Sequence, residues 1–117
     1  MAILKAQLTL SGTFVSDDFS IALTNDDLVV NNDVAIQKIT APTAGIEIFN
    51  TVRGKSYVYI RNLDTDTVTI ESAASGGIQY ISLEKDEFAY FPWAGSAPLY
   101  AIGSDNDAFV EVGIFEN

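Results

Sequence analysis

The stretch SYVYIRNLDTDTVTIE, residues 56–71, alternates apolar and polar side chains on either side of an acidic turn. Successive side chains of a β-strand point to opposite faces, so this pattern predicts two strands that each bury one face. We expect the two strands to pair as a hairpin. The predicted inner pairs are Ile60 with Val68 and Val58 with Ile70, and the outer pairs are Tyr57 with Glu71, Tyr59 with Thr69 and Arg61 with Thr67.

Short alternating runs of the same kind recur along the chain. We expect strands near residues 2–10, 19–24, 28–30, 34–40, 45–51, 56–62, 66–71, 78–83, 87–91, 98–103 and 108–115. Turn-forming stretches such as TNDD (24–27), APTAG (41–45) and AGSAP (94–98) separate them. No convincing helical pattern interrupts the runs. The sequence therefore predicts an all-β fold, a single antiparallel β-sandwich of jelly-roll type with about eight or more short strands.

The length of 117 residues predicts one domain, residues 1–117. Its first strand, AILKAQLTL (2–10), places leucine and alanine at even positions and polar residues at odd ones. We interpret residues 1–12 as either an edge strand of the sandwich or an arm that adds a strand to a neighbouring molecule. The alternation lacks the uninterrupted apolar core of a secretory signal peptide.

Sixteen acidic residues and six basic residues give the chain a net charge of −10. An acidic surface repels phosphate backbones and anionic headgroups, so binding to nucleic acid or to a membrane surface is disfavoured. No apolar run approaches the roughly 20 residues that span a bilayer.

Two residue types on which many catalytic and metal sites depend are missing. The chain has neither histidine nor cysteine, which excludes Ser-His-Asp and Cys-His nucleophiles and histidine-ligated zinc. SGG at residues 75–77 lacks the spacing and the lysine of a phosphate-binding loop, so we interpret it as a turn. Nothing in the sequence selects a carboxylate pair for a glycosidase. We predict no enzymatic activity and no cofactor.

Acidic pairs occur at four places, which are Asp17-Asp18, Asp26-Asp27, Asp64 with Asp66, and Asp105 with Asp107. Calcium requires several converging oxygen ligands. The stretches that begin like calcium loops lack the third ligand and the glycine of such loops. Aspartate is common in turns because its side chain bonds the backbone nearby, so we interpret these pairs as turn residues and predict no metal site.

A second hairpin is predicted in IQYISLEKDEFAYF, residues 78–91, with a tight turn at Lys85-Asp86. Both of its faces are apolar. The predicted pairs put Phe88 and Tyr90 in the core, opposite Leu83 and Ile81, and leave Tyr80 beside Phe91 on the other face. Pro92 donates no backbone hydrogen bond, so the strand ends there or lies at a sheet edge, which leaves Trp93 at a corner.

The last strand repeats this surplus of rings, since Phe109 and Phe115 lie opposite its aliphatic face. A sandwich has only one inner face per sheet. Three interpretations remain: ordinary surface aromatics, a sugar-binding platform, or a protein interface. Sugar sites add polar groups beside the rings, whereas Trp93 has alanine, glycine, serine and proline around it. Aromatic residues dominate protein interfaces, which we favour. The predicted contact residues are Tyr80, Phe91, Trp93, Leu99, Tyr100, Phe109 and Phe115.

Three stretches carry a resemblance, which are GKSYVYIRNLDTDTVTIE (54–71), ISLEKDEFAYFPW (81–93) and LYAIGSDNDAFVEVGIFE (99–116). Together they resemble small virion structural proteins of tailed bacteriophages. In that family a YVYIkN strand precedes an L-x-x-G-E turn, and a strand ending in E-x-x-x-F-E closes the chain. The resemblance covers residues 54–117, while residues 1–53 share only the general strand pattern. This chain has Lys85-Asp86-Glu87 where a glycine is common.

The resemblance implies a capsid decoration (cement) protein. Such proteins are small, acidic and β-rich, are often trimeric, and bind the outer capsid surface over junctions between subunits. It therefore implies the major capsid protein and further copies of this chain as partners, with the virion as location after synthesis in the host cytoplasm. The alternatives are another virion component, in a tail, fibre base or head closure, and a carbohydrate-binding β-sandwich module.

Overall fold

The computed structural model describes residues 2–13, 18–30, 36–105 and 107–116. These residues form ten β-strands and one short 3-10 turn, η1 (Thr51–Arg53), and no α-helix lies among them. The strands are β1 (Ala2–Thr13), β2 (Asp18–Val30), β3 (Gln37–Ala41), β4 (Ile46–Phe49), β5 (Ser56–Asn62), β6 (Val68–Glu71), β7 (Gln79–Leu83), β8 (Phe88–Trp93), β9 (Leu99–Gly103) and β10 (Ala108–Glu116). The prediction of an all-β fold is confirmed.

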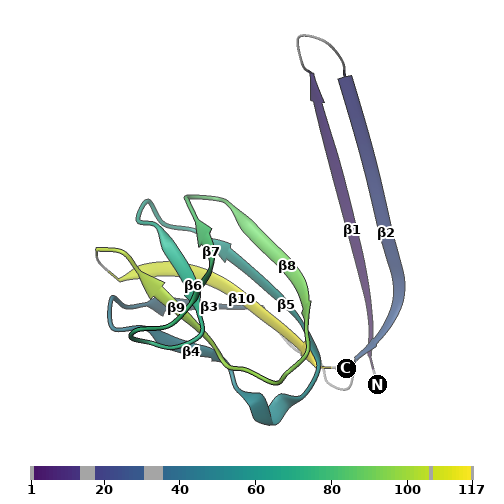
Figure 1. Ribbon diagram of the computed structural model, residues 1–117. Coiled ribbons are helices and arrows are strands. Elements are labelled where there is room, and N and C mark those ends of the chain that lie inside the picture. The colour runs from purple at the N-terminus through teal and green to yellow at the C-terminus, as the bar shows by residue number, and fades with distance from the viewer. Residues whose placement is uncertain (1, 14–17, 31–35, 106, 117) are drawn as a thin grey trace.

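Eight of the strands form two four-stranded sheets that pack face to face, and β1 and β2 form a separate hairpin beside them (Figure 1). The strand order is β3-β10-β5-β8 in one sheet and β4-β9-β6-β7 in the other. The two sheets enclose the core, in which Phe49, Ile60, Ile70 and Leu99 are the largest fully buried apolar side chains. The sandwich predicted from the alternating pattern is therefore confirmed.

The antiparallel ladders of the sandwich are nested. β6 pairs with β7, β5 with β8, β4 with β9, and β3 with β10. The chain thus folds as one long antiparallel double strand with its tip at β6–β7. It is rolled so that successive ladders, from β6–β7 outward, fall in alternate sheets. Two further ladders, β10–β5 and β9–β6, join the rolled pairs into sheets. This nesting is the jelly-roll topology.

The jelly roll overturns both predicted hairpins. β5 and β6 lie in opposite sheets, and so do β7 and β8. Val58, Ile60, Val68 and Ile70 are all fully buried, as expected, but they belong to sheets that face each other across the core and are not ladder partners. Alternation determines which face of a strand is buried and leaves open which strand lies next to it. The matched register of apolar and polar residues, together with the short connections, made these hairpins plausible.

The predicted turn at residues 24–27 is also wrong, because β2 runs through it as one strand (Figure 1). Leu4 pairs with Leu28 and Ala6 with Asn25, so one residue of β1 faces two of β2 between them. This arrangement is a β-bulge, which absorbs the acidic pair without ending the strand. Other predicted features, the strand start at residues 34–35 among them, lie outside the described residues.

The turn between β7 and β8 contains a residue with a left-handed backbone conformation. Asp86 has φ of 66°, and it is the one non-glycine residue with positive φ in the described part of the chain. Aspartate tolerates this left-handed conformation better than most residues. The Asp86 amide also donates to the carbonyl of Asn62, at 2.7 Å, which holds the turn against β5.

Asn62 is a fully buried polar residue at the end of β5. Its Nδ2 donates to the carbonyl oxygens of Asp66 and Leu83, each at 2.8 Å, and its Oδ1 accepts from the amide of Asp64 at 2.9 Å. The side chain therefore uses both amide hydrogens and one lone pair. It ties β5 to the loop that crosses toward β6 and to the end of β7 in the opposite sheet.

Replacing Asn62 with alanine should lower the free energy of unfolding by about 2–4 kcal/mol, because two buried carbonyls lose their donor. Asn50→Ala is the matched control. Its Oδ1 accepts from the amide of Val52 at 3.0 Å in an exposed cap, which predicts a loss of about 0.5–1 kcal/mol. Urea denaturation of the two variants measures both values. Equal losses would contradict a structural role for the buried amide.

Two glycines meet where the loop before β5 passes the loop after β8. Gly95 has φ of 87°, and a Cβ there would collide with the backbone of Gly54. Gly54 has φ of 70°, and a Cβ there would meet nothing within 4 Å. Both positions favour glycine through their backbone conformation, but only Gly95 also requires the missing side chain for close approach.

Gly95→Ala should therefore destabilise the protein more than Gly54→Ala does. The backbone conformation alone costs alanine about 1–3 kcal/mol at either position. The collision at Gly95 requires the two loops to separate, which should raise the loss to about 3 kcal/mol or more. Thermal unfolding of the two variants compares them directly, and a larger loss at Gly54 would contradict the close approach.

Candidate interaction surface

The outer face of the sheet that contains β5 is lined with aromatic rings. Ser56, Val58, Ile60 and Asn62 of β5 are fully buried, so the residues between them face outward. Cross-strand partners share a face, and the ladders pair these outward residues with aromatic neighbours on β8 and β10. We call this surface the outer aromatic face. It comprises Tyr57, Tyr59, Phe88, Tyr90, Phe109 and Phe115.

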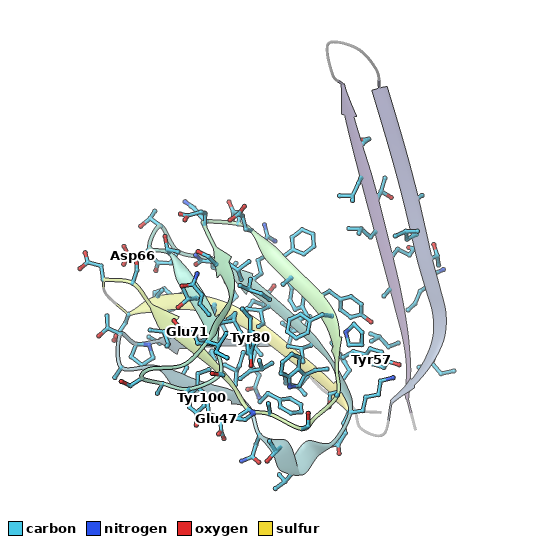
Figure 2. The ribbon with its side chains drawn as sticks, viewed as in Figure 1. Glu47, Tyr57, Asp66, Glu71, Tyr80 and Tyr100 are labelled. Carbon is cyan, nitrogen blue, oxygen red and sulfur yellow. The ribbon has the colours of Figure 1, made fainter. Side chains whose placement is uncertain are left out.

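Several of these rings are exposed to solvent. Phe109 is 60% exposed, Phe88 is 56% exposed and Tyr90 is 39% exposed. The rings of Tyr57 and Tyr90 stack with centroids 6.4 Å apart. Figure 2 shows Tyr57 on the side of the sandwich nearest the β1–β2 hairpin. Exposed rings on one face of a sheet, here beside the charged pair of Arg61 and Glu111, mark a candidate interaction site on a small protein.

Tyr59 is the polar member of the outer aromatic face. Its hydroxyl donates a hydrogen bond of 2.7 Å to Oε1 of Glu111 on β10. Partial burial raises the pKa of Tyr59, and the neighbouring Glu111 carboxylate raises it further. The phenol therefore remains neutral at physiological pH and acts as a fixed donor. This bond holds the ring at the centre of the sheet, between the strands that carry the exposed rings.

Phe88 and Tyr90 were predicted in the core, and that prediction is wrong. β8 pairs with β5, so Phe91 lies opposite buried Val58, and Trp93 lies opposite buried Ser56. Phe91 and Trp93 accordingly face the core and pack against it, while Phe88 and Tyr90 face outward. The segment FAYFPW is apolar at nearly every position, so its own pattern does not select a face.

Trp93 is anchored at the open edge of the sandwich between β7 and β8. Its indole Nε1–H donates to the carbonyl of Ala97 at 2.8 Å. Its ring contacts Phe91 and Tyr80 edge to face, with centroid distances of 5.8 Å and 5.7 Å. Trp93 is thus a half-buried ring with its polar group satisfied. Pro92 lies on an edge strand, β8, which confirms one of the two positions expected for it.

The remaining predicted contact residues lie in three different parts of the sandwich. Leu99 is fully buried in the core, so it offers no surface to a partner and its prediction as a contact residue is corrected. Tyr100 lies on the other sheet, where its hydroxyl donates to Glu47 at 3.1 Å. Figure 2 labels both residues. That hydrogen bond raises the pKa of Tyr100. Phe109 and Phe115 belong to the outer aromatic face.

The β1–β2 hairpin carries a second apolar surface. Leu4, Ala6, Leu8 and Leu10 share one face of β1, and Leu23 of β2 pairs with Leu8 on the same face. We call this surface the apolar arm face. Leu8, Leu10 and Leu23 are exposed, although leucine gains from burial. β1 and β2 pair with each other and with no other strand of the described residues.

A groove of about 1120 Å³ lies between the hairpin and the sandwich. The apolar arm face forms one wall. The other wall is β8, with neighbouring side chains that include Tyr59, Tyr80 and Phe115. Both walls are apolar, and among the lining residues Lys5 is the charged one. The groove therefore brings together rings that are distant in sequence and the N-terminal strand.

The acidic pairs form no metal site in the described part of the chain. No cluster of three aspartate or glutamate residues with suitable geometry occurs there. The Asp64 carboxylate instead accepts hydrogen bonds from the backbone amides of Phe109, Asp66 and Thr65. The amide of Phe109 is the largest cause of a lowered pKa for Asp64. Asp17 lies outside the described residues.

Among the described residues, no helix is long and apolar enough to cross a membrane.

No protein family model matches this chain, and no curated protein or solved structure matches it either.

On β8, Phe91 faces the core and Phe88 faces solvent. We therefore expect alanine substitutions at these two residues to differ in their effect on stability. Phe91→Ala should lower the free energy of unfolding by about 2–4 kcal/mol, because it leaves a cavity against the core. Phe88→Ala should change it by less than about 0.5 kcal/mol, because the ring is exposed. Urea denaturation measures both. The reverse ranking would support the hairpin expected from the sequence.

Proposed function

We propose that this protein is a non-enzymatic virion structural protein. It acts as a capsid decoration (cement) protein that binds the outer capsid surface at subunit junctions and stabilises the head. The observation that carries the proposal is the outer aromatic face, with Phe88 and Phe109 more than half exposed. Such a face costs solubility unless a partner covers it. The resemblance of residues 54–117 to small phage virion proteins names the class of partner.

The charge of the chain is compatible with this location. A protein on the outside of a filled capsid makes no contact with DNA, and a net charge of −10 disfavours such contact. The same charge limits non-specific association of the free protein in solution. Binding then relies on apolar surface, which contributes about 25 cal/mol per Å² before the costs of association.

We propose that the binding form is a homo-oligomer, and the resemblance favours a trimer. One copy bound to one capsid subunit gains a single interface. An oligomer centred on a junction contacts several capsid subunits, and each contact raises the effective concentration of the next. Separation of the capsid subunits then requires several contacts to break together. This coupling is the physical basis of reinforcement.

Two rival functions use the same features. A tail, fibre-base or head-closure component would need the same acidic β-rich chain with an apolar surface. A carbohydrate-binding module would use exposed rings, and the stacked pair of Tyr57 and Tyr90 is the place for it. Trp93 does not serve as an open sugar platform, because it is half-buried and its indole N–H is engaged. A glycan array probed with the wild type and with the Tyr90→Ala variant tests for carbohydrate binding.

Virus particles assembled with and without the gene for this protein test the proposal. We expect the protein on the outer shell in a fixed ratio to the major capsid protein. Particles without it should release DNA at a lower temperature, and added purified protein should restore the wild-type temperature. Cryo-electron microscopy and a heat-release assay measure the two effects. A location confined to the tail, or absence from particles, would refute the decoration role.

Surface variants in the same heat-release assay identify the surface that binds the capsid. Phe109→Ser should fail to restore heat resistance, because the change removes an exposed ring from the part of the outer aromatic face that does not line the groove. Val52→Ser is the matched control, since Val52 is 86% exposed on η1 and lies outside that face. Both variants should remain folded. Equal restoration by the two would show that another surface binds the capsid.

A further inference from the structure

The β1–β2 hairpin requires a cover that its own chain does not supply. Its strands have 12 and 13 residues, which at about 3.4 Å per residue makes it roughly 40 Å long. An isolated two-stranded hairpin is marginally stable in water at best. The apolar arm face nevertheless remains in solvent, with Leu8 37% exposed and Leu23 59% exposed.

The sandwich of the same chain lies beside this face without closing on it. The groove between the apolar arm face and β8 holds about 1120 Å³, and both of its walls are apolar. On the β8 side the exposed rings of Phe88 and Tyr90 belong to the lining. Two complementary apolar surfaces are therefore present on one molecule, and each is uncovered.

We propose that the occupant is a second copy of this chain. The apolar arm face of one copy packs on the β8 side of the outer aromatic face of the next, and every copy gives one hairpin and receives one. The inference rests on the homo-oligomer proposed above, and it names the surface that holds the oligomer together. It does not depend on where in the virion the oligomer binds.

The area of the contact favours reciprocal exchange over one-sided docking. One face of a hairpin that is about 40 Å long and about 10 Å wide covers roughly 400 Å². Docking buries a similar area on the partner, so one contact removes roughly 800 Å² from solvent, which is below the roughly 1,200 Å² of stable interfaces. Two contacts per copy reach roughly 1,600 Å². A two-fold dimer and a closed ring of three both satisfy this requirement.

Charge also points to this surface. Two molecules of net charge −10 repel each other, so they approach most easily through surfaces without acidic residues. Lys5 is the charged residue among those that line the groove, and it is basic. Contact here therefore brings no carboxylates of the lining together. The remainder of the described surface carries many acidic side chains, which makes other self-contacts less favourable.

Engineered cysteines test the exchange cleanly, because the chain has no cysteine of its own. One variant carries Leu10→Cys on the apolar arm face, and the other carries Phe88→Cys on β8. Mild oxidation of the mixed variants should give a mixed disulfide of about 25 kDa, twice the 12.6 kDa chain. Ser104→Cys, in the exposed loop after β9, replaces Phe88→Cys in the control mixture and should give little mixed disulfide.

A charge variant supplies the second measurement. Leu8→Glu with Leu23→Glu places two carboxylates on the apolar arm face and leaves the sandwich unchanged, which Trp93 fluorescence can verify. Sedimentation of wild type should show an oligomer, and the variant should self-associate at least about 10-fold more weakly. Val52→Glu is the control at an exposed apolar residue outside the groove, and it should behave as wild type does.

The outcomes separate this inference from the function on which it rests. A strictly monomeric wild type would overturn both the oligomer and the exchange. An oligomer that resists Leu8→Glu with Leu23→Glu and yields no mixed disulfide would overturn the exchange alone. In a chain with both Leu10→Cys and Phe88→Cys, a disulfide that forms only within single chains would show that the hairpin closes on its own sandwich, and this too would overturn the proposal.

Discussion

The antiparallel ladder between β5 and β8 is the contact on which the surface of this protein depends. β5 has a clear inside and outside, because Val58 and Ile60 can only be buried on one face. β8 has no such preference, since it is apolar at nearly every position. Pairing with β5 forces Phe91 toward the core and Phe88 away from it. A shift by one residue would exchange the two sets of rings and remove the surface proposed for binding.

The polar interior of the fold supports that ladder at one end. In a jelly roll most connections cross from one sheet to the other, and each crossing leaves backbone groups without ladder partners. Asn62 satisfies several of them in a place without room for bulk water, and Asp86 adopts a left-handed conformation so that its amide reaches the Asn62 carbonyl. The start of β8 is held against the end of β5 by this arrangement, which fixes the register of the rings beyond it.

The proposed functions rest on apolar side chains that lie outside the core. The sandwich fills its interior with one face of each strand, and the rings on the other face of β5, β8 and β10 remain outside. The hairpin of β1 and β2 adds a second uncovered apolar face. A small acidic protein that keeps two such surfaces has a use for partners. The proposed exchange between copies uses the apolar arm face and the β8 side of the outer aromatic face, and the proposed capsid contact uses the rest of the outer aromatic face, around Phe109.

The sequence by itself determined the strand content, the sandwich and most of the core. Alternation in residues 56–71 and 108–115 specifies buried faces locally, and the lack of histidine and cysteine limits the chemistry without reference to any fold. Only the tertiary structure decided which strands are neighbours, that Leu99 is buried, and that Phe88 and Tyr90 are exposed while Trp93 packs against the core. The reason is that strand pairing in a jelly roll is long-range, so a segment that is apolar on both faces takes its orientation from a partner distant in sequence.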